Sequence, residues 1–183
     1  KIPFSEKDHV FSQVSAYGIS KRACELYCQY YNRVFSVPTV CLRFFTVYGP
    51  RQRPDMAVHK FTRLIDTGKE IEIYGANTRR DYTYVSDIID GVYSALSKSF
   101  GFEVINLGNN VIHEISDVIA FIQDCLGKDA MVKYGGEQLG DVPVTFADIR
   151  KAKKLLGYRP QTTLKNGVKA FIEWYTENVR DLA

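Results

Sequence analysis

Two stretches of β-branched and aromatic residues, 39–45 and 102–107, each follow a proline-free segment in which apolar residues have helical spacing. The longer segment, residues 15–35, repeats apolar side chains at steps of three and four and predicts one long helix. Strands that are apolar along their whole length are typical of parallel sheets covered by helices on both faces. The predicted fold class is therefore α/β. Because two parallel strands cannot cover themselves, we expect further strands to complete this sheet.

The helix expected at 15–35 is apolar on more than one side. Besides its main stripe it carries a second apolar group: Cys24, Cys28, Tyr31 and Phe35. One stripe is enough for a helix that packs against a sheet, so the second face needs another cover. We expect this cover to be a partner subunit or a further segment of chain.

Shorter elements are expected along the rest of the chain. Extended segments are predicted at 70–74 and 80–85, and helices at 58–67, 86–97, 116–126, 149–156 and 164–178. The expected N-cap residues are Ser86, Asp87, Ser116 and Asp117. Gly127 and Gly157 are expected to end their helices.

Composition and charge exclude several functional classes. In 183 residues, no apolar run approaches the roughly 20 residues that a membrane helix requires. The net charge of +3 is too small and too evenly spread to indicate a nucleic-acid surface. The four cysteines are irregularly spaced and far from the three histidines, which disfavours a metal site and a disulfide framework. We therefore expect no metal, no membrane or nucleic-acid partner, and a cytoplasmic location.

The first chemical motif is Tyr17 followed four residues later by Lys21, at the start of the long helix. Side chains at this spacing share one helix face, so the ammonium can favour the phenolate form and prepare a general base. About one such pair is expected by chance in a chain of this composition, and a surface tyrosine beside a solvated lysine is the simpler interpretation. The surrounding motifs must decide between the two.

Three further motifs follow in a fixed order. They are RFFTVYGPRQRPDMA at 43–57, RRDYTYVSDI at 79–88 and GDVPVTFAD at 140–148. None of the thirteen glycines forms a Gly-x-Gly-x-x-Gly motif, so the loop that binds the phosphates of a dinucleotide is not present in these residues.

In order and spacing, these motifs resemble the extended short-chain dehydrogenase/reductases of the NAD-dependent nucleotide-sugar epimerase/dehydratase family, and most closely the UDP-glucuronate 4-epimerase-like group. The resemblance runs through essentially all 183 residues. It covers only the C-terminal half of such an enzyme. A chain that opens on Lys1 rather than Met fits the expectation of a fragment.

The resemblance implies a C-terminal part of a Rossmann-like doubly wound parallel sheet plus a small mixed α/β substrate domain. Segments 1–48 and 85–110 would complete the Rossmann-like domain, and segments 49–84 and 111–183 would form the substrate domain. The N-terminal NAD-binding half, with its glycine-rich loop and catalytic Ser/Thr, would be absent. The fragment alone is then expected to be inactive.

The activity implied is NAD-dependent 4-epimerisation of a UDP-sugar through a 4-keto intermediate, with UDP-glucuronate as the expected substrate. UDP-glucose or UDP-N-acetylglucosamine epimerases, nucleotide-sugar dehydratases or decarboxylases, and a non-catalytic sugar-nucleotide-binding module remain alternatives. The resemblance also implies pairing of subunits through the helix at 15–35, and together with the second apolar face of that helix it predicts a homodimer.

The resemblance also assigns roles to individual residues. Tyr17 would be the catalytic acid/base, and Lys21 would activate it and hold the nicotinamide ribose. Phe44 and Phe45 would line the nicotinamide pocket, although both are equally interpreted as core. The substrate-binding residues implied are Thr46, Arg53, Lys60, Glu72, Tyr74, Arg80 and Asp141. For Asp141, a turn residue is the simpler interpretation.

Arg53 carries the most specific hypothesis. A guanidinium can bind a carboxylate through two parallel hydrogen bonds, which suits the C6 acid of UDP-glucuronate. The alternative is that Arg51 and Arg53 are solvent-facing loop arginines. The commoner uronate pattern has glycine between the two arginines, whereas this chain has Gln52. That departure leaves neutral UDP-hexoses and UDP-N-acetylhexosamines open as substrates.

Overall fold

The long helix predicted at 15–35 is present as α1 (Ala16–Phe35) in the computed structural model, which describes residues 1–8, 15–75, 78–136 and 142–180. Its first turn is capped by Ser15, whose Oγ accepts a hydrogen bond from the backbone N–H of Gly18 at 3.1 Å. It ends at Ser36, which is left-handed with φ 56°. Within the described ranges, no helix has both the length and the apolarity needed to cross a membrane.

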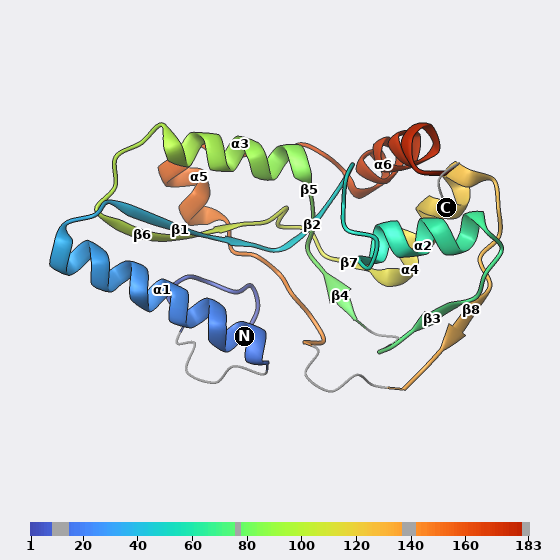
Figure 1. Cartoon of the computed structure of the whole chain (residues 1–183), viewed down its shortest axis with the longest axis horizontal. Helices are drawn as coiled ribbons and strands as arrows, with labels where there is room; N and C mark the ends of the chain where they lie inside the picture. The colour runs from blue at the N-terminus through green and yellow to red at the C-terminus, as the bar shows by residue number, and fades with distance from the viewer. Residues whose placement is uncertain (9–14, 76–77, 137–141, 181–183) are drawn as a thin grey trace.

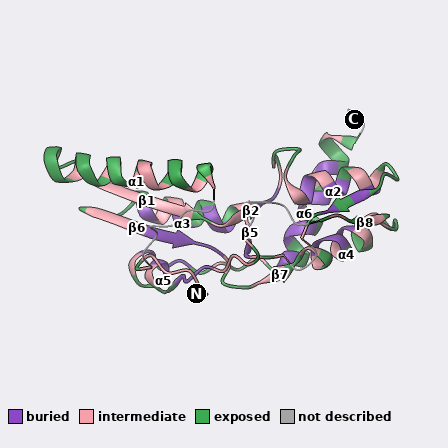
Figure 2. Cartoon of the chain, turned by 90° about the horizontal axis from the view of Figure 1, so that it is seen from below, coloured by how far each residue is buried: buried purple, intermediate pink, exposed green. Residues whose placement is uncertain are grey.

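The two predicted long strands pair with each other. β1 (Thr39–Phe44) runs parallel to β6 (Phe102–Leu107), with Thr39 opposite Phe102 and Phe44 opposite Leu107. Helices α1 and α3 (Val85–Leu96) lie on the two faces of this pair (Figure 1). None of the residues of α1 is buried, and Figure 2 shows its outer side exposed along its length. The exposed apolar residues come from both predicted groups, since they include Leu26, Tyr27, Tyr30 and Val34 as well as Tyr31 and Phe35. Cys28 of the second group is only partly exposed.

The chain changes strand partner directly after β1. The backbone N–H of Phe45 donates to the carbonyl of Leu107 at 3.1 Å, and the next one, of Thr46, donates to the carbonyl of Asp81 at 3.1 Å. From there β2 (Thr46–Tyr48) runs parallel to β5 (Tyr82–Tyr84). The segment 39–48 therefore pairs first with β6 and then with β5, and in this way it connects the two strand pairs.

Two more strand pairs complete the described sheets. β3 (Ile71–Ile73) runs parallel to β8 (Val132–Tyr134), and β4 (Arg79–Arg80) runs antiparallel to β7 (His113–Glu114). The segment predicted as one extended piece at 80–85 is divided between β4 and β5. Strands β2, β7 and β8 were not predicted, because two or three residues are too few to show a period-2 pattern.

Two clusters of buried side chains lie in different parts of the molecule. One surrounds Tyr48 and Phe171 between α2 (Ala57–Asp66), α4 (Ile115–Leu126) and α6 (Leu164–Asn178). The other joins Ile105 and Leu107 of β6 to α3 and α5 (Arg150–Leu156). The second cluster also includes residues from 147 to 158, which the predicted domain boundaries assign to the substrate domain. The boundaries themselves stay a prediction.

The predicted N-caps of two helices are wrong. Helix α3 begins one residue before Ser86, and its N-cap is Tyr84. Asp87 is buried instead and accepts hydrogen bonds from the backbone N–H groups of Gln161 at 3.0 Å and Thr162 at 3.1 Å. These distant donors compete with the helix for the carboxylate.

Helix α4 likewise begins before Ser116, with Glu114 as its N-cap. The carboxylate of Asp117 accepts from the backbone N–H of Glu114 at 3.0 Å, and together the two residues form a capping box. The glycines predicted to end helices do so, since Gly127 and Gly157 have φ values of 62° and 70°.

Helix α1 is attached to β1 by an ion pair that predicts acid sensitivity. Glu25 accepts from Arg43 Nε at 2.6 Å and Nη2 at 2.8 Å, and from Arg22 Nη1 at 2.8 Å. Burial raises the pKa of Glu25, but the hydrogen bonds and charges of Arg43 and Arg22 outweigh it and hold the pKa below its ordinary 4.5. This stabilisation is present above pH 4.5 and is lost as pH falls through the folded-state pKa.

We expect Glu25→Gln to lower the free energy of unfolding at pH 7 by about 1 to 2 kcal/mol. It should also flatten the loss of stability below pH 4.5, because the titrating group is gone. Urea unfolding curves between pH 3 and 7, followed by circular dichroism, measure both effects. An acid sensitivity equal to that of the wild type would contradict this prediction.

Candidate active site

Tyr17 and Lys21 lie one turn apart on the exposed side of α1. The ammonium of Lys21 is 5.3 Å from the centroid of the Tyr17 ring, within the range of a cation–π contact, and the tyrosine is 71% exposed. The contact brings a positive charge beside the ring that carries the predicted acid/base hydroxyl. Ser15 caps the first turn of this helix, and the four-residue spacing puts both residues on one helix face.

The carboxyl end of β1 carries the next predicted residues. Phe44 is 51% exposed, whereas Phe45 packs beside Phe4, with ring centroids 6.5 Å apart, and against the buried cluster around β6. Thr46 opens β2 and is partly buried. Of the two aromatic residues, Phe44 is therefore the more accessible to a ligand, and Phe45 is the more firmly packed.

The loop after β2 is held from inside by Gln52. The Gln52 side chain donates to the carbonyl of Val47 at 3.0 Å and accepts from the backbone N–H of His59 at 3.2 Å. In return, Nδ1 of the buried His59 lies 2.7 Å from the carbonyl of Gln52. Gln52, which replaces the glycine of the commoner uronate pattern, therefore uses its side chain for hydrogen bonds to the backbone of this region.

Arg53 is paired with a neighbour that the sequence analysis did not single out. Arg53 Nε donates to Asp55 Oδ1 at 3.0 Å and Nη2 donates to Asp55 Oδ2 at 2.5 Å. This hydrogen-bonded pair raises the pKa of Arg53, and the Tyr17 side chain adds a smaller electrostatic contribution in the same direction. Tyr17 and Arg53, 36 positions apart in the printed sequence, therefore lie within electrostatic range of each other.

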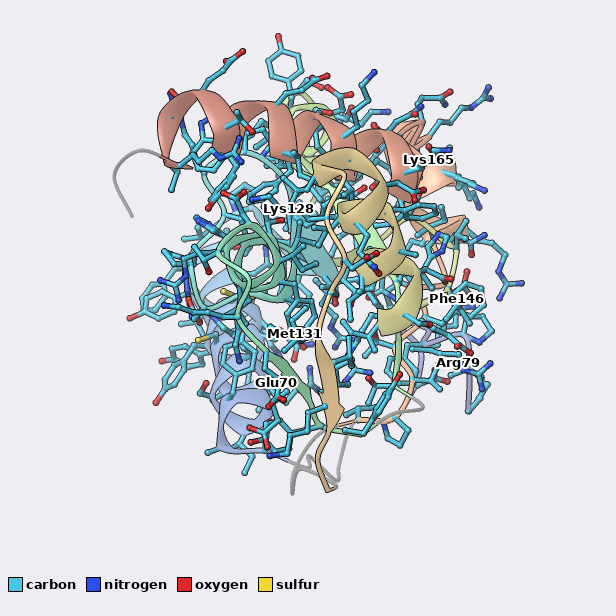
Figure 3. The ribbon with its side chains drawn as sticks, turned by 90° about the vertical axis from the view of Figure 1, so that its right-hand side faces the viewer. Glu70, Arg79, Lys128, Met131, Phe146 and Lys165 are labelled. Carbon is cyan, nitrogen blue, oxygen red and sulfur yellow. The ribbon has the colours of Figure 1, made fainter. Side chains whose placement is uncertain are left out.

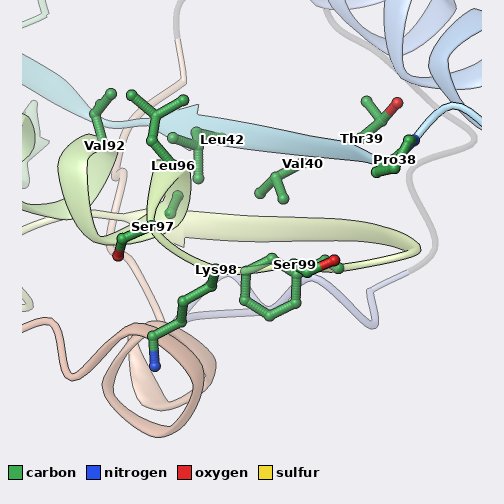
Figure 4. Close-up of a pocket in the computed structure, with 11 residues that line it drawn as sticks. Pro38, Thr39, Val40, Leu42, Val92, Leu96, Ser97, Lys98 and Ser99 are labelled. Atoms are coloured by element: carbon green, nitrogen blue, oxygen red, sulfur yellow. The ribbon is translucent and has the colours of Figure 1, made fainter.

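A hollow of about 280 Å³ opens beside Arg53, between Val47, Met56 and Val85. A second hollow, of about 540 Å³, lies between β1 and α3 and is lined by Val40, Leu42, Val92 and Leu96 (Figure 4). The second hollow contains none of the residues predicted for the site. The first hollow is lined by Arg53 itself.

Arg80 is the last residue of β4, and the buried Asp81 connects it to β5. The Asp81 carboxylate accepts from the backbone N–H groups of Asn109 at 2.7 Å, Asn110 at 3.0 Å and Ala147 at 3.1 Å. Burial raises the pKa of Asp81, while these hydrogen bonds act against that effect. The carboxylate joins three segments that meet near Thr46, whose N–H donates to the Asp81 carbonyl at 3.1 Å.

Arg80 itself is half-buried, and its Nη1 donates to the carbonyls of Arg79 at 3.1 Å and Pro143 at 3.2 Å. Arg79 is the exposed member of the pair. The two neighbours therefore differ in exposure, as alternation along a strand predicts.

Glu72 and Tyr74 lie at the β3–β8 pair, which Figure 3 shows beginning near Glu70 and Met131. A hydrogen bond to Glu72 raises the pKa of Tyr74. The Tyr74 ring lies against Gly135, where a Cβ would be 3.0 Å from two of its ring carbons. A side chain at position 135 would therefore press on this ring, which is 45% exposed.

The remaining predicted residues are less defined. Lys60 lies in the first turn of α2 and is partly buried. Asp141 lies outside the described residues. The sequence analysis missed Asp55, His59, Asp81 and Gly135 as parts of the site. For Asp55 a signal was present, since a carboxylate two residues after Arg53 across Pro54 can reach its guanidinium.

The NAD dependent epimerase/dehydratase family model matches residues 1–108. The chain belongs to this family. A UDP-glucuronate 4-epimerase of Thermodesulfobacterium geofontis is 39% identical over 97% of this chain and 55% of the relative. An uncharacterized protein of Methanocaldococcus jannaschii is 45% identical, again over 97% of this chain and 55% of the relative. The chain therefore spans about half the length of the curated relatives it matches.

Solved structures of the epimerase family share this fold. The Bacillus cereus UDP-glucuronic acid 4-epimerase, in complex with NAD and a fluorinated UDP-glucuronic acid, matches with a TM-score of 0.90 at 36% identity, over 97% of this chain and 57% of the other. The predicted mixed α/β fold, similar to Rossmann-like epimerases over their C-terminal half, is confirmed. The family assignment made from the motifs is confirmed too.

Proposed function

We propose that this chain supplies the proton-transfer and sugar-binding residues of an NAD-dependent UDP-sugar 4-epimerase, with UDP-glucuronate as the sugar. The observation that carries the proposal is the grouping of Tyr17, Lys21 and Arg53. The ammonium of Lys21 lies over the Tyr17 ring, and the guanidinium of Arg53 is within electrostatic range of the phenol. All three side chains are exposed. One group handles a hydroxyl proton and another a carboxylate, which is what a 4-epimerase of a uronic acid needs.

The residues present fit NAD. Tyr17 and Lys21 are both exposed, and the exposed Phe44 supplies an aromatic surface at the end of β1. When bound, NAD supplies the hydride acceptor and donor at the sugar C4. In this proposal Lys21 and Phe44 help to hold it, and Phe45 supports Phe44 from the packed side.

Tyr17 would take the proton from the sugar 4-OH and return it after C4 has inverted. Thr46 would face the reacting sugar. Arg80 would bind the diphosphate as a fixed cation, with Lys60 near a phosphate or ribose. Glu72 and Tyr74 would contact the uracil at the β3–β8 pair, and Asp141 would contact the ribose.

We also propose that the protein forms a homodimer, with the exposed apolar side of α1 as the contact between the two subunits.

Neutral UDP-hexoses are the second candidate substrates, and the Arg53–Asp55 pair favours them, because Asp55 already occupies one edge of the guanidinium. The test incubates the protein, as encoded in full by its gene, with NAD and either UDP-glucuronate, UDP-glucose or UDP-N-acetylglucosamine. Proton NMR then detects inversion at C4, loss of CO2 or loss of water. Epimerisation of UDP-glucuronate supports the proposal. If CO2 is the main product, the protein is a decarboxylase, and if water is the main product, it is a dehydratase; either result contradicts the proposal.

We expect Arg53→Ala to raise the KM for UDP-glucuronate about tenfold, because two charge-assisted hydrogen bonds are lost. It should also release CO2, since a 4-keto uronic acid is a β-keto acid that loses CO2 when its carboxylate turns out of the carbonyl plane. KM for UDP-glucose should change less than twofold. Kinetics with both sugars and a CO2 assay measure this, with the exposed Arg63→Ala on α2 as the control. An equal rise of KM for both sugars would contradict the assignment.

A further inference from the structure

The pairing of Arg53 with Asp55 is prearranged by the backbone. The backbone N–H of Met56 donates to the carbonyl of Arg53 at 3.1 Å, which closes a turn with Pro54 inside it. Proline restricts the turn, so the two side chains leave it close together with little entropy to lose. Gln52 and His59 hold the preceding part of the same loop through three contacts of 2.7 to 3.2 Å.

Asp55 takes one whole edge of the guanidinium. Its two oxygens accept from Nε at 3.0 Å and from Nη2 at 2.5 Å, in the fork geometry that a ligand carboxylate would use. The pair also cancels the positive charge of Arg53. Both side chains are open to solvent, with 76% and 62% exposure, so the pair is accessible to a ligand.

We propose that Asp55 is the residue that sets the selectivity between acidic and neutral UDP-sugars, by acting as a built-in competitor for Arg53. The inference rests on the proposed function, because it places the sugar C6 at Arg53. An acidic sugar must displace the Asp55 carboxylate or bind beside a second negative charge. A neutral sugar has neither cost.

The position of Tyr17 also supports a role for the Arg53–Asp55 pair in substrate selectivity. Tyr17 is close enough to contribute to the electrostatics of Arg53, so the guanidinium borders the region where the sugar would react. In this proposal the charge of the Arg53–Asp55 pair acts at the sugar C6, whereas the uracil would bind at Glu72 and Tyr74, on the β3–β8 pair. Selectivity should change without any change in affinity for UDP alone.

The test is Asp55→Asn in the NAD-loaded protein encoded by the full gene. Asparagine keeps the shape of the side chain and one carbonyl acceptor for Arg53, but removes the negative charge. Isothermal titration calorimetry at low salt compares UDP-glucuronate, UDP-glucose and UDP. We expect the Kd of UDP-glucuronate to fall about tenfold and the other two to change less than twofold. The gain should shrink as salt is raised.

Asp124→Asn is the matched control, because it removes the same charge from an exposed position on α4. It should change none of the three dissociation constants. If the wild type binds the sugars but Asp55→Asn leaves the ratio of their dissociation constants unchanged, the inference is overturned and the proposed function stands. The same holds if Asp55→Asn weakens the binding of UDP-glucuronate. If the wild type binds neither UDP-sugar, the proposed function fails and this inference fails with it.

Discussion

Replacing Tyr17 with phenylalanine is expected to lower kcat for the UDP-sugar by about 10²- to 10⁴-fold, the usual range for losing a general acid/base. The change removes one oxygen and keeps the ring under Lys21. Because the side chain is 71% exposed, the free energy of unfolding should change by less than about 0.5 kcal/mol. Steady-state kinetics and urea unfolding of the same preparation separate the two effects.

Tyr27→Phe provides the control for Tyr17→Phe. Tyr27 lies on the same helix and is 68% exposed, but it is ten residues further along the chain. Its substitution removes an identical hydroxyl and should leave kcat within twofold. A Tyr17→Phe enzyme that keeps more than a third of the wild-type kcat would exclude this tyrosine as the acid/base.

Gly167→Ala is expected to destabilise the protein by about 3 kcal/mol, at the upper end of the cost of overpacking. Gly167 is the position at which α6 crosses Tyr48 of β2, and a Cβ there would lie 2.1 Å from Tyr48 Oη and 2.8 Å from a Tyr84 ring carbon. Tyr48 is 1% exposed and is packed in the buried cluster that contains Phe171. In an open helix the same substitution stabilises by roughly 0.5 to 1 kcal/mol, so the expected sign is opposite to that of helix propensity.

Urea unfolding measures the effect of Gly167→Ala, with Gly101→Ala as the control, because nothing lies within 4 Å of a Cβ at that position. The double variant with Tyr48→Phe removes the nearest clashing atom and should lose less stability than the sum of the two single variants. Stability equal to or above the wild type would show that α6 does not pack this closely on β2.

The site could be predicted from sequence where its parts are local. Four residues separate Tyr17 from Lys21, and on a helix that spacing alone puts both on one face. Pairings over longer distances could not be predicted in the same way. Gln52 was interpreted as a departure that bears on the substrate, but its side chain hydrogen-bonds Val47 and His59. Asp87 was expected to cap α3, but residues 161 and 162 take its carboxylate.

The sequence by itself determined the α/β class, the extent of α1, β1, β6 and α6, and the family to which the chain belongs. Helical spacing, β-branched runs and glycine stops act over a few residues, so local pattern is sufficient for them. Tertiary structure alone decided which strands pair, which carboxylates are buried and what Arg53 touches. Asp81 shows the reason, because its hydrogen-bond donors come from residues 109, 110 and 147. A buried carboxylate needs hydrogen-bond donors, and the folded chain can supply them from residues that are far away in the sequence.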